Sequence, residues 1–468
     1  MLSSRAVSPR LRYHFSGIAG AGTDPLARLL RAWGHDVQGS DRAFDQGKSA
    51  EVAEGLRRAG VRLTPHDGSA IVPDLDRVVH STAVESETPE LVAARALGLP
   101  LVPRPALLAE LLAAAAPGVA VAGTSGKSTI VALVGWLLRE AGVPASVLGG
   151  AGLVGEDATL CVVGPAGGPL VAEACESDES LTGYRAALGL IHNVSRDHAE
   201  LPVLRARFAA FARGLGRVLV NAACPEAAAI GRAVGARTYG RDAEADARAV
   251  LVDAGPASTH GRLEVDGRAL RLDVPLPGRH NFDNAVAAVL VALELGVPAP
   301  TIEALLPRFP GVRRRFELVG TTASGIRVVD DYAHNAAKLE AALTTAQVSA
   351  PRVLACFQPH GYGPARALRP ELRALLPRLL RPADRFCYLE IYYAGGTTTR
   401  DLSSRALAED LAGLLPCGYA EDHAAAVRWV VRHAQPGDTV LIMGARDPDL
   451  PHLARAVLRA LDRQPVAV

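Results

Sequence analysis

The stretch Gly118–Gly142, GVAVAGTSGKSTIVALVGWLLREAG, decides the fold. It opens with an uninterrupted apolar run typical of a buried parallel strand, and it ends with the apolar spacing of a helix. Between them lies the glycine loop AGTSGKST, Ala122–Thr129. A strand, a glycine loop and a helix in this order suit a phosphate chain, because the N–H groups of the loop and of the helix N-terminus point toward the anion. The stretch therefore predicts an α/β domain that binds nucleotide phosphates.

Two side chains of this loop have predicted roles. Lys127 can reach the β- and γ-phosphates of a nucleotide, and the Ser128 hydroxyl can hold magnesium. Lys127 is conspicuous because the chain has only two other lysines, Lys48 and Lys338. The common form of the motif has a glycine six residues before the lysine, where this chain has Val121. The loop is therefore a shorter variant, and its alternative interpretation is a plain turn rich in small residues.

Polar clusters follow two later apolar strands. Glu173 lies near the end of the stretch PLVAEA, and a carboxylate at the carboxyl end of a strand faces the crevice where ligands bind in open α/β sheets. We therefore predict that Glu173 shares a metal ion with Ser128, whereas Glu176 and Asp178 are weaker candidates. His198, in HNVSRDHAE, could bind a second divalent ion or orient a substrate, although a single loop histidine is more often structural.

The first residues predict a second nucleotide-binding unit. A strand over residues 10–18 leads into the glycine turn GIAGAG at residues 17–22, then into a helix, and the next strand ends in Asp41. This order fits a diphosphate turn followed by a ribose-binding carboxylate. The spacing G-x-x-G-x-G differs from the dinucleotide fingerprint G-x-G-x-x-G, so the pattern does not identify NAD. A simple tight turn is the alternative.

The remaining chain continues the alternation of strands and helices. Apolar stretches such as GRVLVNAA, RVLACFQP and DTVLIMGA recur with helical patterns between them, which predicts an α/β fold with mainly parallel sheets. The 468 residues have room for about three domains. We predict a Rossmann-like domain over residues 1–107, a central P-loop ATPase-like domain over 108–312 and a Rossmann-like C-terminal domain over 313–468.

The composition argues against several classes of protein. Lys and Arg number 50 against 49 Asp and Glu, and hydrophobic residues make up 49%, so neither disorder nor a nucleic-acid partner is expected. The six cysteines form no C-x-x-C pair, which predicts reduced thiols in a cytoplasmic protein. The most apolar stretch, residues 107–123, is interrupted by Glu110 and Pro117, so we expect no membrane span, and the first residues have no apolar signal-peptide core.

The motifs stand in the order in which they occur in the Mur ligases, ATP-dependent enzymes that form amide bonds in peptidoglycan synthesis. The resemblance covers nearly the whole chain and is strongest to the branch that joins L-alanine to UDP-N-acetylmuramate. It rests on HFSGIAGAG, VQGSD, VVHSTAV, AGTSGKST, EACESD, NVSRDH, GRHNFDNAVAA, FPGVRRRFE, VVDDYAHNAAKLEAAL, FQPH and DTVLIMGA. It implies a cytoplasmic ligase, monomeric or weakly dimeric, that uses ATP and Mg²⁺ to activate the carboxylate of a UDP-sugar for attack by a small amino acid or peptide.

The resemblance also implies roles for individual residues. Catalysis would fall to Lys127, Glu173, His198 and Arg314 or Arg315, and the metal ligands would be Ser128, Glu173 and His198. ATP would contact Gly123, Thr124, Ser125, Gly126, Lys127, Ser128, Thr129, His280, Asn281, Asn284 and Asp331. The substrates would contact Gly17, Gly20, Gly22, Asp41, Ser81, His334 and His360.

The chain departs from the family at several positions. Cys175 replaces an acid, and Asn335 and Ala336 replace a histidine and a proline. Gly361 and Pro364 stand where the alanine-adding branch carries arginines that recognise the carboxylate of the incoming amino acid. Losing two fixed cations from such a site should weaken binding unless another donor substitutes.

Arg366 and Arg369 are candidates for that substitute. Other Mur ligases use a carbamylated lysine in the central domain, which is impossible here because no lysine lies between Lys127 and Lys338. Two alternatives stay open: a diverged ligase that joins another amino acid or a peptide to a UDP-muramyl-like acid, and a nucleotide-binding regulatory protein without ligase activity.

Overall fold

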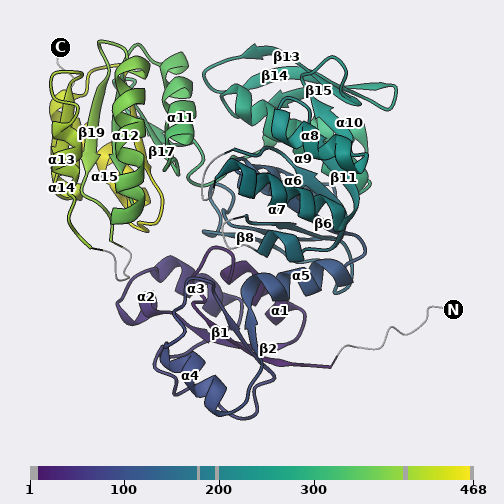
Figure 1. Ribbon diagram of the computed structural model, residues 1–468. Coiled ribbons are helices and arrows are strands. Elements are labelled where there is room, and N and C mark those ends of the chain that lie inside the picture. Colours follow the sequence, from purple (N-terminus) through teal and green to yellow (C-terminus); the bar gives the residue numbers. More distant parts are fainter. Residues whose placement is uncertain (1–8, 177–179, 196–199, 394–398, 464–468) are drawn as a thin grey trace. The chain divides into compact units, whose positions relative to one another are not determined.

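The computed structural model describes residues 9–176, 180–195, 200–393 and 399–463. The chain divides into two compact units. Unit 1 comprises residues 1–252, 260–274 and 283–310, and unit 2 comprises residues 253–259, 275–282 and 311–468. Three separate sheets, each with helices, make up the fold, in agreement with the predicted α/β class (Figure 1).

The N-terminal sheet is parallel and has the strand order β3-β2-β1-β4-β5. Its strands are β1 (Arg12–Ser16), β2 (Asp36–Ser40), β3 (Arg62–Leu63), β4 (Arg77–His80) and β5 (Leu101–Pro103). Its helices are α1 (Asp24–Ala32), α2 (Arg42–Asp45), α3 (Ala50–Arg58), α4 (Pro89–Ala96) and α5 (Arg104–Ala114). The glycine turn links β1 to α1, as the sequence predicts, and α5 crosses the domain boundary that we predict at residue 107.

The central sheet has the order β15-β14-β13-β12-β11-β10-β6-β9-β7-β8. Its strands are β6 (Gly118–Ala122), β7 (Ser146–Gly149), β8 (Leu160–Val162), β9 (Leu170–Glu173), β10 (Ala186–Ile191), β11 (Leu215–Asn221), β12 (Arg237–Gly240), β13 (Ala247–Ala254), β14 (Thr259–Val265) and β15 (Arg268–Val274). Its helical elements are α6 (Lys127–Glu140), η1 (Ser180–Gly183), α7 (Leu201–Arg213), α8 (Pro225–Val234), α9 (Arg279–Glu294), α10 (Ala299–Leu305) and η2 (Leu306–Arg308). Every residue of β6 is buried, which explains its uninterrupted apolar sequence.

The C-terminal sheet has the order β16-β17-β21-β18-β19-β20, parallel except for β16. Its strands are β16 (Glu317–Thr321), β17 (Arg327–Asp331), β18 (Val353–Gln358), β19 (Arg385–Leu389), β20 (Cys417–Ala420) and β21 (Thr439–Gly444). Its helices are α11 (Ala336–Ser349), α12 (Tyr362–Leu379), α13 (Ser404–Glu409), α14 (His423–His433) and α15 (Leu450–Asp462).

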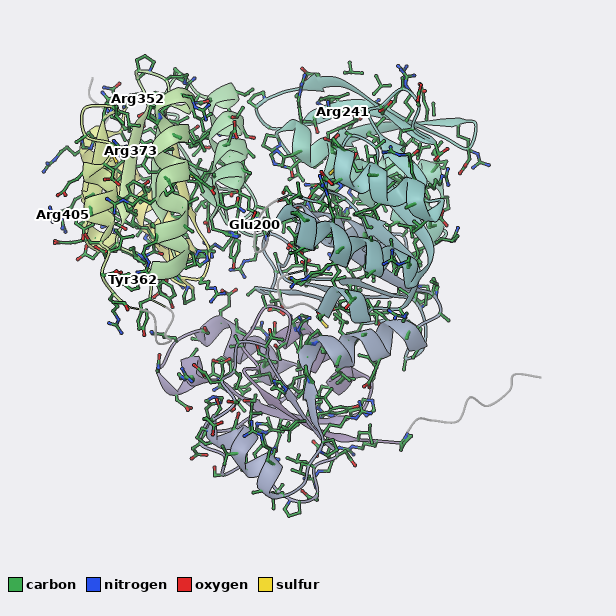
Figure 2. The ribbon with its side chains drawn as sticks, in the orientation of Figure 1. Glu200, Arg241, Arg352, Tyr362, Arg373 and Arg405 are labelled. Carbon is green, nitrogen blue, oxygen red and sulfur yellow. The ribbon has the colours of Figure 1, made fainter. Side chains whose placement is uncertain are left out.

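Helices cover both faces of this C-terminal sheet. Successive residues of β17 belong to different cores, since Val329 packs in the core that contains Leu339 of α11, and Val328 packs in the core that contains Leu453 of α15. Strand side chains alternate between the two faces of a sheet, so each face has its own apolar core. Figure 2 shows Arg352, which precedes β18 and forms an ion pair with Asp438 at 2.6 Å. Within the described ranges, no helix is both long and apolar enough to cross a bilayer.

A buried polar network connects the elements around the N-terminal glycine turn. Gln38 of β2 donates to Nδ1 of His14 at 3.1 Å, so His14 carries its proton on Nε2 and donates to the Glu90 carboxylate at 3.0 Å. The other Glu90 oxygen lies 3.1 Å from Nδ1 of His66, and Ser40 also donates to Glu90. Because Glu90 is fully buried, these partners are needed to hold its charge.

Candidate active site

The glycine loop follows β6, whose two neighbours in the sheet are β9 and β10. Both neighbours run parallel to β6, with Val121 paired to Glu173 and Ala122 paired to Ile191. The carboxyl ends of the three strands therefore meet at one edge. This topology brings Glu173, at the end of β9, and Asn193, just after β10, beside the loop, as the sequence predicts for Glu173.

Asn193 holds the loop in shape. Its side-chain oxygen accepts from the Ser125 N–H at 2.8 Å, its amide donates to the Ser125 carbonyl at 3.1 Å, and its backbone carbonyl accepts from the Thr124 N–H at 3.0 Å. Gly126 has φ +88°, and a Cβ there would stand 2.3 Å from Oδ1 of Asn284. Only glycine fits this backbone and this space. The sequence analysis missed Asn193, whose only signal is its place directly after a strand next to β6.

Lys127 begins α6, and its side chain is 13% exposed. Its ammonium donates to Oε2 of Glu176 at 2.7 Å and to the Gly123 carbonyl. Burial by itself lowers the pKa of Lys127, but the Glu176 carboxylate outweighs this effect, so the net pKa is raised and the lysine stays protonated. Glu176 thus holds the Lys127 ammonium beside the loop.

Ser128 and Glu173 lie together as predicted for a metal pair. The Ser128 hydroxyl is 3.2 Å from Oε2 of Glu173, and the other Glu173 oxygen accepts from the Gly150 N–H at 2.6 Å. A hydroxyl and a carboxylate are hard oxygen donors of the kind that Mg²⁺ prefers, usually together with waters and substrate phosphates. Among the described residues no three His, Cys, Asp or Glu side chains form a ready-made metal cluster. His198 and Asp178 lie outside the described residues.

The remaining predicted ATP contacts in the central domain lie on α9. Asn281 and Asn284 are buried, and the Asn281 amide donates to the Pro277 carbonyl at 2.8 Å. His280, in the first turn of α9, is exposed. Thr129, next in the loop after Ser128, is buried in the first turn of α6.

The N-terminal glycine turn is shaped by close contacts. Gly17 has φ +77°, and a Cβ there would lie 3.1 Å from the Ser81 Cβ. Asp41 accepts from the Ala19 N–H at 3.0 Å and, with its other oxygen, from the Ala43 N–H at 2.9 Å. Asp41 therefore ties the turn to the start of α2, a role in addition to the predicted one at the ribose.

Arg104 is a second group that sequence reasoning missed. Its guanidinium lies 3.5 Å from the position of a Cβ at Gly22, and the backbone N–H of Asp24 bonds to the Gly20 carbonyl at 2.9 Å. A guanidinium beside a glycine turn that opens a helix suits a diphosphate. Arg104 is distant in the sequence from the turn, so only the fold reveals their proximity.

Unit 2 places the predicted residues Arg314, Arg315 and Asp331 around the end of β17. The Arg314 guanidinium donates to the carbonyls of Gly444 at 2.8 Å and Ala445 at 3.0 Å and lies 3.3 Å from Asp330. Both arginines also lie over the ring of Tyr332. The guanidinium carbon of Arg315 is 4.8 Å from the centroid of that ring. Arg314 is thus held by contacts within its own domain.

Asp331 is engaged by the backbone on both oxygens. It accepts from the N–H groups of Phe316 and Ala333, each at 2.7 Å. Burial raises the pKa of Asp331 even though Arg315 and these N–H groups favour the charged form, and burial raises the pKa of Asp330 to about 6. A ribose hydroxyl could donate to Asp331 only if it shared a carboxylate oxygen with one of these N–H groups.

His334 and His360 meet at the carboxyl edge of the same sheet. Their ring centroids are 5.3 Å apart, although they follow different strands, β17 and β18. Of the departures in the sequence, Gly361 has φ +72° and precedes α12, and Asn335 caps α11 by accepting from the Lys338 N–H at 3.0 Å. The structure thus explains Asn335 by its capping role.

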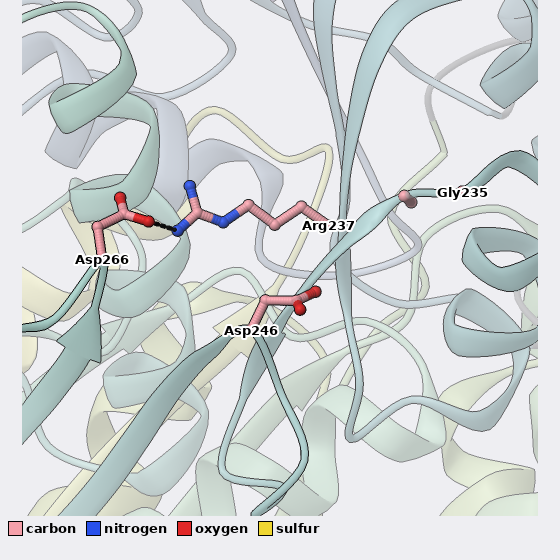
Figure 3. A pocket seen from close by; sticks show the side chains of 5 residues that line it. Gly235, Arg237, Asp246 and Asp266 are labelled. Carbon is pink, nitrogen blue, oxygen red and sulfur yellow. Dashed lines mark hydrogen bonds and ion pairs between the residues drawn. The ribbon is translucent and has the colours of Figure 1, made fainter.

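An open hollow elsewhere in unit 1 contains none of the predicted site residues. It measures about 600 Å³ and is lined by Gly235, Ala236, Arg237, Asp246 and Asp266. Arg237 points at Asp266 and bonds to it at 2.7 Å (Figure 3). Asp246 accepts from the N–H and hydroxyl of Thr238. The charged groups that line the hollow therefore bond to one another or to neighbouring protein groups, which argues against a catalytic role for the hollow.

Comparison with known proteins agrees with this geometry. Three family models match: the Mur ligase family catalytic domain over residues 12–116, the Mur ligase middle domain over 121–292 and the Mur ligase glutamate ligase domain over 314–446. The chain is 38% identical to the UDP-N-acetylmuramate–L-alanine ligase of Kineococcus radiotolerans, over 93% of each chain. It is 36% identical to the ligase of the same name from Acidothermus cellulolyticus, over 97% of this chain and 95% of the relative.

Solved structures show the same architecture. The UDP-N-acetylmuramate–alanine ligase of Thermotoga maritima superposes with a TM-score of 0.78 at 25% identity, covering 96% of this chain and 99% of that one. A murein peptide ligase from Psychrobacter arcticus shares the fold, with a TM-score of 0.70 at 23% identity, covering 98% of this chain and all of that one. The predicted three-domain fold and enzyme class are confirmed, and the regulatory alternative loses its support. The chain belongs to the Mur ligase family, the ATP-dependent ligases of peptidoglycan precursor synthesis.

Proposed function

We propose that the protein joins the carboxylate of UDP-N-acetylmuramate to the amine of L-alanine, with ATP and Mg²⁺. The observation that carries the proposal is the arrangement of Lys127, Ser128 and Glu173 around the glycine loop, in a chain similar over 93% of its length to ligases of that name. An amide does not form from a free carboxylate without activation. ATP would supply the activating phosphoryl group, and the glycine loop would hold its phosphate chain.

The first step is phosphoryl transfer. The sugar carboxylate attacks the γ-phosphorus of ATP, the bond to the β–γ bridging oxygen breaks, and ADP leaves from an acyl phosphate. Lys127 exchanges its contact with Glu176 for the phosphate oxygens, and the loop N–H groups hold the β-phosphate. Ser128 and Glu173 would hold Mg²⁺, which neutralises charge on the phosphates when bound. Arg314 or Arg315 would supply a further positive charge to the transferring group.

The second step is attack by the amine. The neutral amine adds to the acyl carbon, loses a proton, and expels inorganic phosphate, which leaves the amide. Histidines His334 and His360 lie at the sheet edge assigned to the acceptor. Gly17, Gly20 and Gly22, with Asp41, Ser81 and Arg104, would hold the UDP portion and so fix the position of the carboxylate. No covalent enzyme intermediate is required.

A diverged acceptor preference is the second candidate. Gly361 and Pro364 support it, because neither residue can replace the arginines of the alanine-adding branch. Under this alternative, the activating step is unchanged and another small amino acid or a peptide replaces L-alanine.

Phosphate release with ATP, Mg²⁺, UDP-N-acetylmuramate and each amino acid in turn tests both candidates. The proposal predicts that L-alanine gives the highest kcat/KM and that release stops when the UDP-sugar is omitted. A higher kcat/KM for another amine selects the diverged ligase. Release that needs no UDP-sugar, or none with any amine, contradicts the proposed function.

A further inference from the structure

The cation that recognises the acceptor carboxylate is the missing part of the proposed site. In this chain Gly361 and Pro364 carry no charge, and the nearest arginines on α12 are already paired. Arg366 forms an ion pair with Asp401 and also donates to the Thr399 carbonyl, while Arg369 forms a two-pronged pair with Asp410. Both guanidinium groups on α12 are thus engaged by acids from other segments, which directs attention to a cation on another element.

Lys338 is a cation at the required edge of the sheet. It lies in the first turn of α11, which starts just after β17, and its N–H is fixed by the Asn335 cap. Its ammonium lies 3.4 Å from Nε2 of His334. Ligands of open α/β sheets bind at the carboxyl ends of the strands, so Lys338 stands where the third domain receives its substrate.

The neighbouring histidines set the direction of this ammonium. Nδ1 of His334 is 2.9 Å from the Tyr332 carbonyl, which can only accept, so His334 carries its proton on Nδ1. Nε2 is then unprotonated, and its lone pair accepts a hydrogen bond from the Lys338 ammonium. His360, after β18, packs its ring against His334 at 5.3 Å. Because β21 lies between β17 and β18, this cluster stands above the carboxyl end of the middle strand of the three.

Positive groups other than the ammonium belong to the same cluster. The N-terminus of a 14-residue helix contributes partial positive charge beside the ammonium, and Arg315 stacks on the Tyr332 ring that packs against His334. An ammonium has three donors, so a contact with His334 is compatible with a contact to a carboxylate oxygen. We propose that Lys338, oriented by His334, binds the carboxylate of the incoming amino acid in place of the arginines absent at positions 361 and 364.

This inference rests on the proposed function and predicts a preference that can be measured directly. L-alanine and L-alaninamide offer the same amine, but only L-alanine offers a carboxylate. In steady-state assays at saturating ATP and UDP-N-acetylmuramate, Lys338→Met should lower kcat/KM for L-alanine roughly 10- to 100-fold, mainly through KM, because a charge-assisted contact is lost. The value for L-alaninamide should change little, so the preference for L-alanine collapses.

Four further variants make the experiment decisive. Lys338→Arg restores a cation and should recover most of the preference, which a purely structural role of Lys338 would not require. Arg373→Met, on the exposed side of α12 (Figure 2), is the matched control and should keep the wild-type preference. If Arg366→Met or Arg369→Met collapses the preference instead, the charge comes from α12 and the inference is wrong.

Failure of the inference is distinguishable from failure of the proposed function. If the wild-type protein uses neither L-alanine nor any other amino acid, the proposed function is wrong. If the wild-type protein prefers L-alanine and folded Lys338→Met keeps that preference, only the role of Lys338 is wrong. Thermal unfolding of each variant, compared with wild type, identifies any that is misfolded, and Lys338→Gln then serves as a second test.

Discussion

Among single residues, Lys127 has the clearest expected phenotype. Replacing it with alanine removes a charged contact to the transferring phosphoryl group, so we expect kcat to fall by at least ~10²-fold with the fold preserved. Phosphate release under saturating substrates measures the effect. Lys48→Ala is the matched control, because Lys48 is exposed and lies in the loop before α3. Near-normal turnover by a folded Lys127→Ala protein would overturn the ATP-site assignment.

Replacing Glu176, in contrast, is expected to strengthen the binding of ATP. Its carboxylate holds the Lys127 ammonium at 2.7 Å, so ATP must displace it to gain the same cation. Glu176→Gln weakens that competing contact, and we expect the dissociation constant for ATP, measured by calorimetry without acceptor, to fall roughly three- to tenfold. An increase instead would mean that Glu176 contributes directly to binding nucleotide or metal.

The sequence predicted the roles of single residues unevenly. Lys127, Ser128 and Glu173 could be placed because strand, loop and helix patterns fix where their side chains point. Asn193 could not be identified, because its function depends on an amide that fits Ser125 across two adjacent strands. Arg104 was missed for the same reason, since a contact between distant segments has no local pattern.

At the level of elements, the Glu90 network links β1, β2 and α4 and predicts a dependence of stability on pH. Burial alone raises the pKa of Glu90, but the bonds from His14 and His66 outweigh it and the pKa is lowered. The Glu90 bond raises the pKa of His66. Stabilisation by Glu90 is therefore complete above its ordinary pKa of 4.5 and declines below it, while that by His66 is complete below 6.5 and declines as pH rises above it.

Glu90→Gln should therefore lower the free energy of unfolding most between pH 4.5 and 6.5, by about 3 kcal/mol, and less on either side. Urea titrations below, within and above that window measure the difference. Asp67→Asn is a suitable control, because Asp67 is an exposed acid in the same region that accepts from the N–H and hydroxyl of Ser69 in its own turn. If the loss in the free energy of unfolding did not change with pH, Glu90 would stabilise the fold through packing rather than through its charge.

The elements around the site were predictable, whereas one outer segment was not. Predicted strands before the glycine turn and the glycine loop correspond to β1 and β6. The segment 237–274, to which the sequence analysis assigned no element, forms β12 to β15. Its strands mix exposed charges with scattered apolar residues, as in the burial pattern of β13, so no clear two-residue alternation appears in the sequence.

For the molecule as a whole, Arg28 connects α1 of the N-terminal sheet to the distant residues Asp157 and Thr159 within unit 1. From α1 it donates to Asp157 at 2.8 Å and to the hydroxyl and carbonyl of Thr159, while Asp24 lies 3.1 Å away. Burial raises the pKa of Asp24 even with Arg28 beside it. Removing the guanidinium leaves a buried carboxylate without its cation.

We expect Arg28→Met to lower the free energy of unfolding by about 3 kcal/mol in urea titrations. Arg58→Met removes an arginine that pairs with the same Asp157 but is 60% exposed, so it should change stability by no more than ~0.5 kcal/mol. If the two variants lowered the free energy of unfolding equally, the burial of Arg28 would not be the cause of its larger contribution.

The overall organisation followed from the order of motifs more than from any single one. Each glycine turn alone has a plain structural alternative, but two turns in a fixed order, with the strands and acids that follow them, predicted an α/β chain of three domains. The identity of the acceptor could not be predicted in this way. It depends on which cation stands beside a bound carboxylate, and that is a property of the folded sheet edge rather than of a motif.

The position of β6 between β9 and β10 also has a consequence for biosynthesis. A ribosome releases the N-terminal part first, so the glycine loop emerges before either neighbouring strand exists. Asn193, which shapes the loop, and Asn284, which packs beside Gly126, are made later still. A nascent chain that stops before Ala186 therefore carries the complete loop sequence without the partners that form it. Such truncated chains lack the Asn193 side chain and carbonyl that bond to Ser125 and Thr124 in the folded protein.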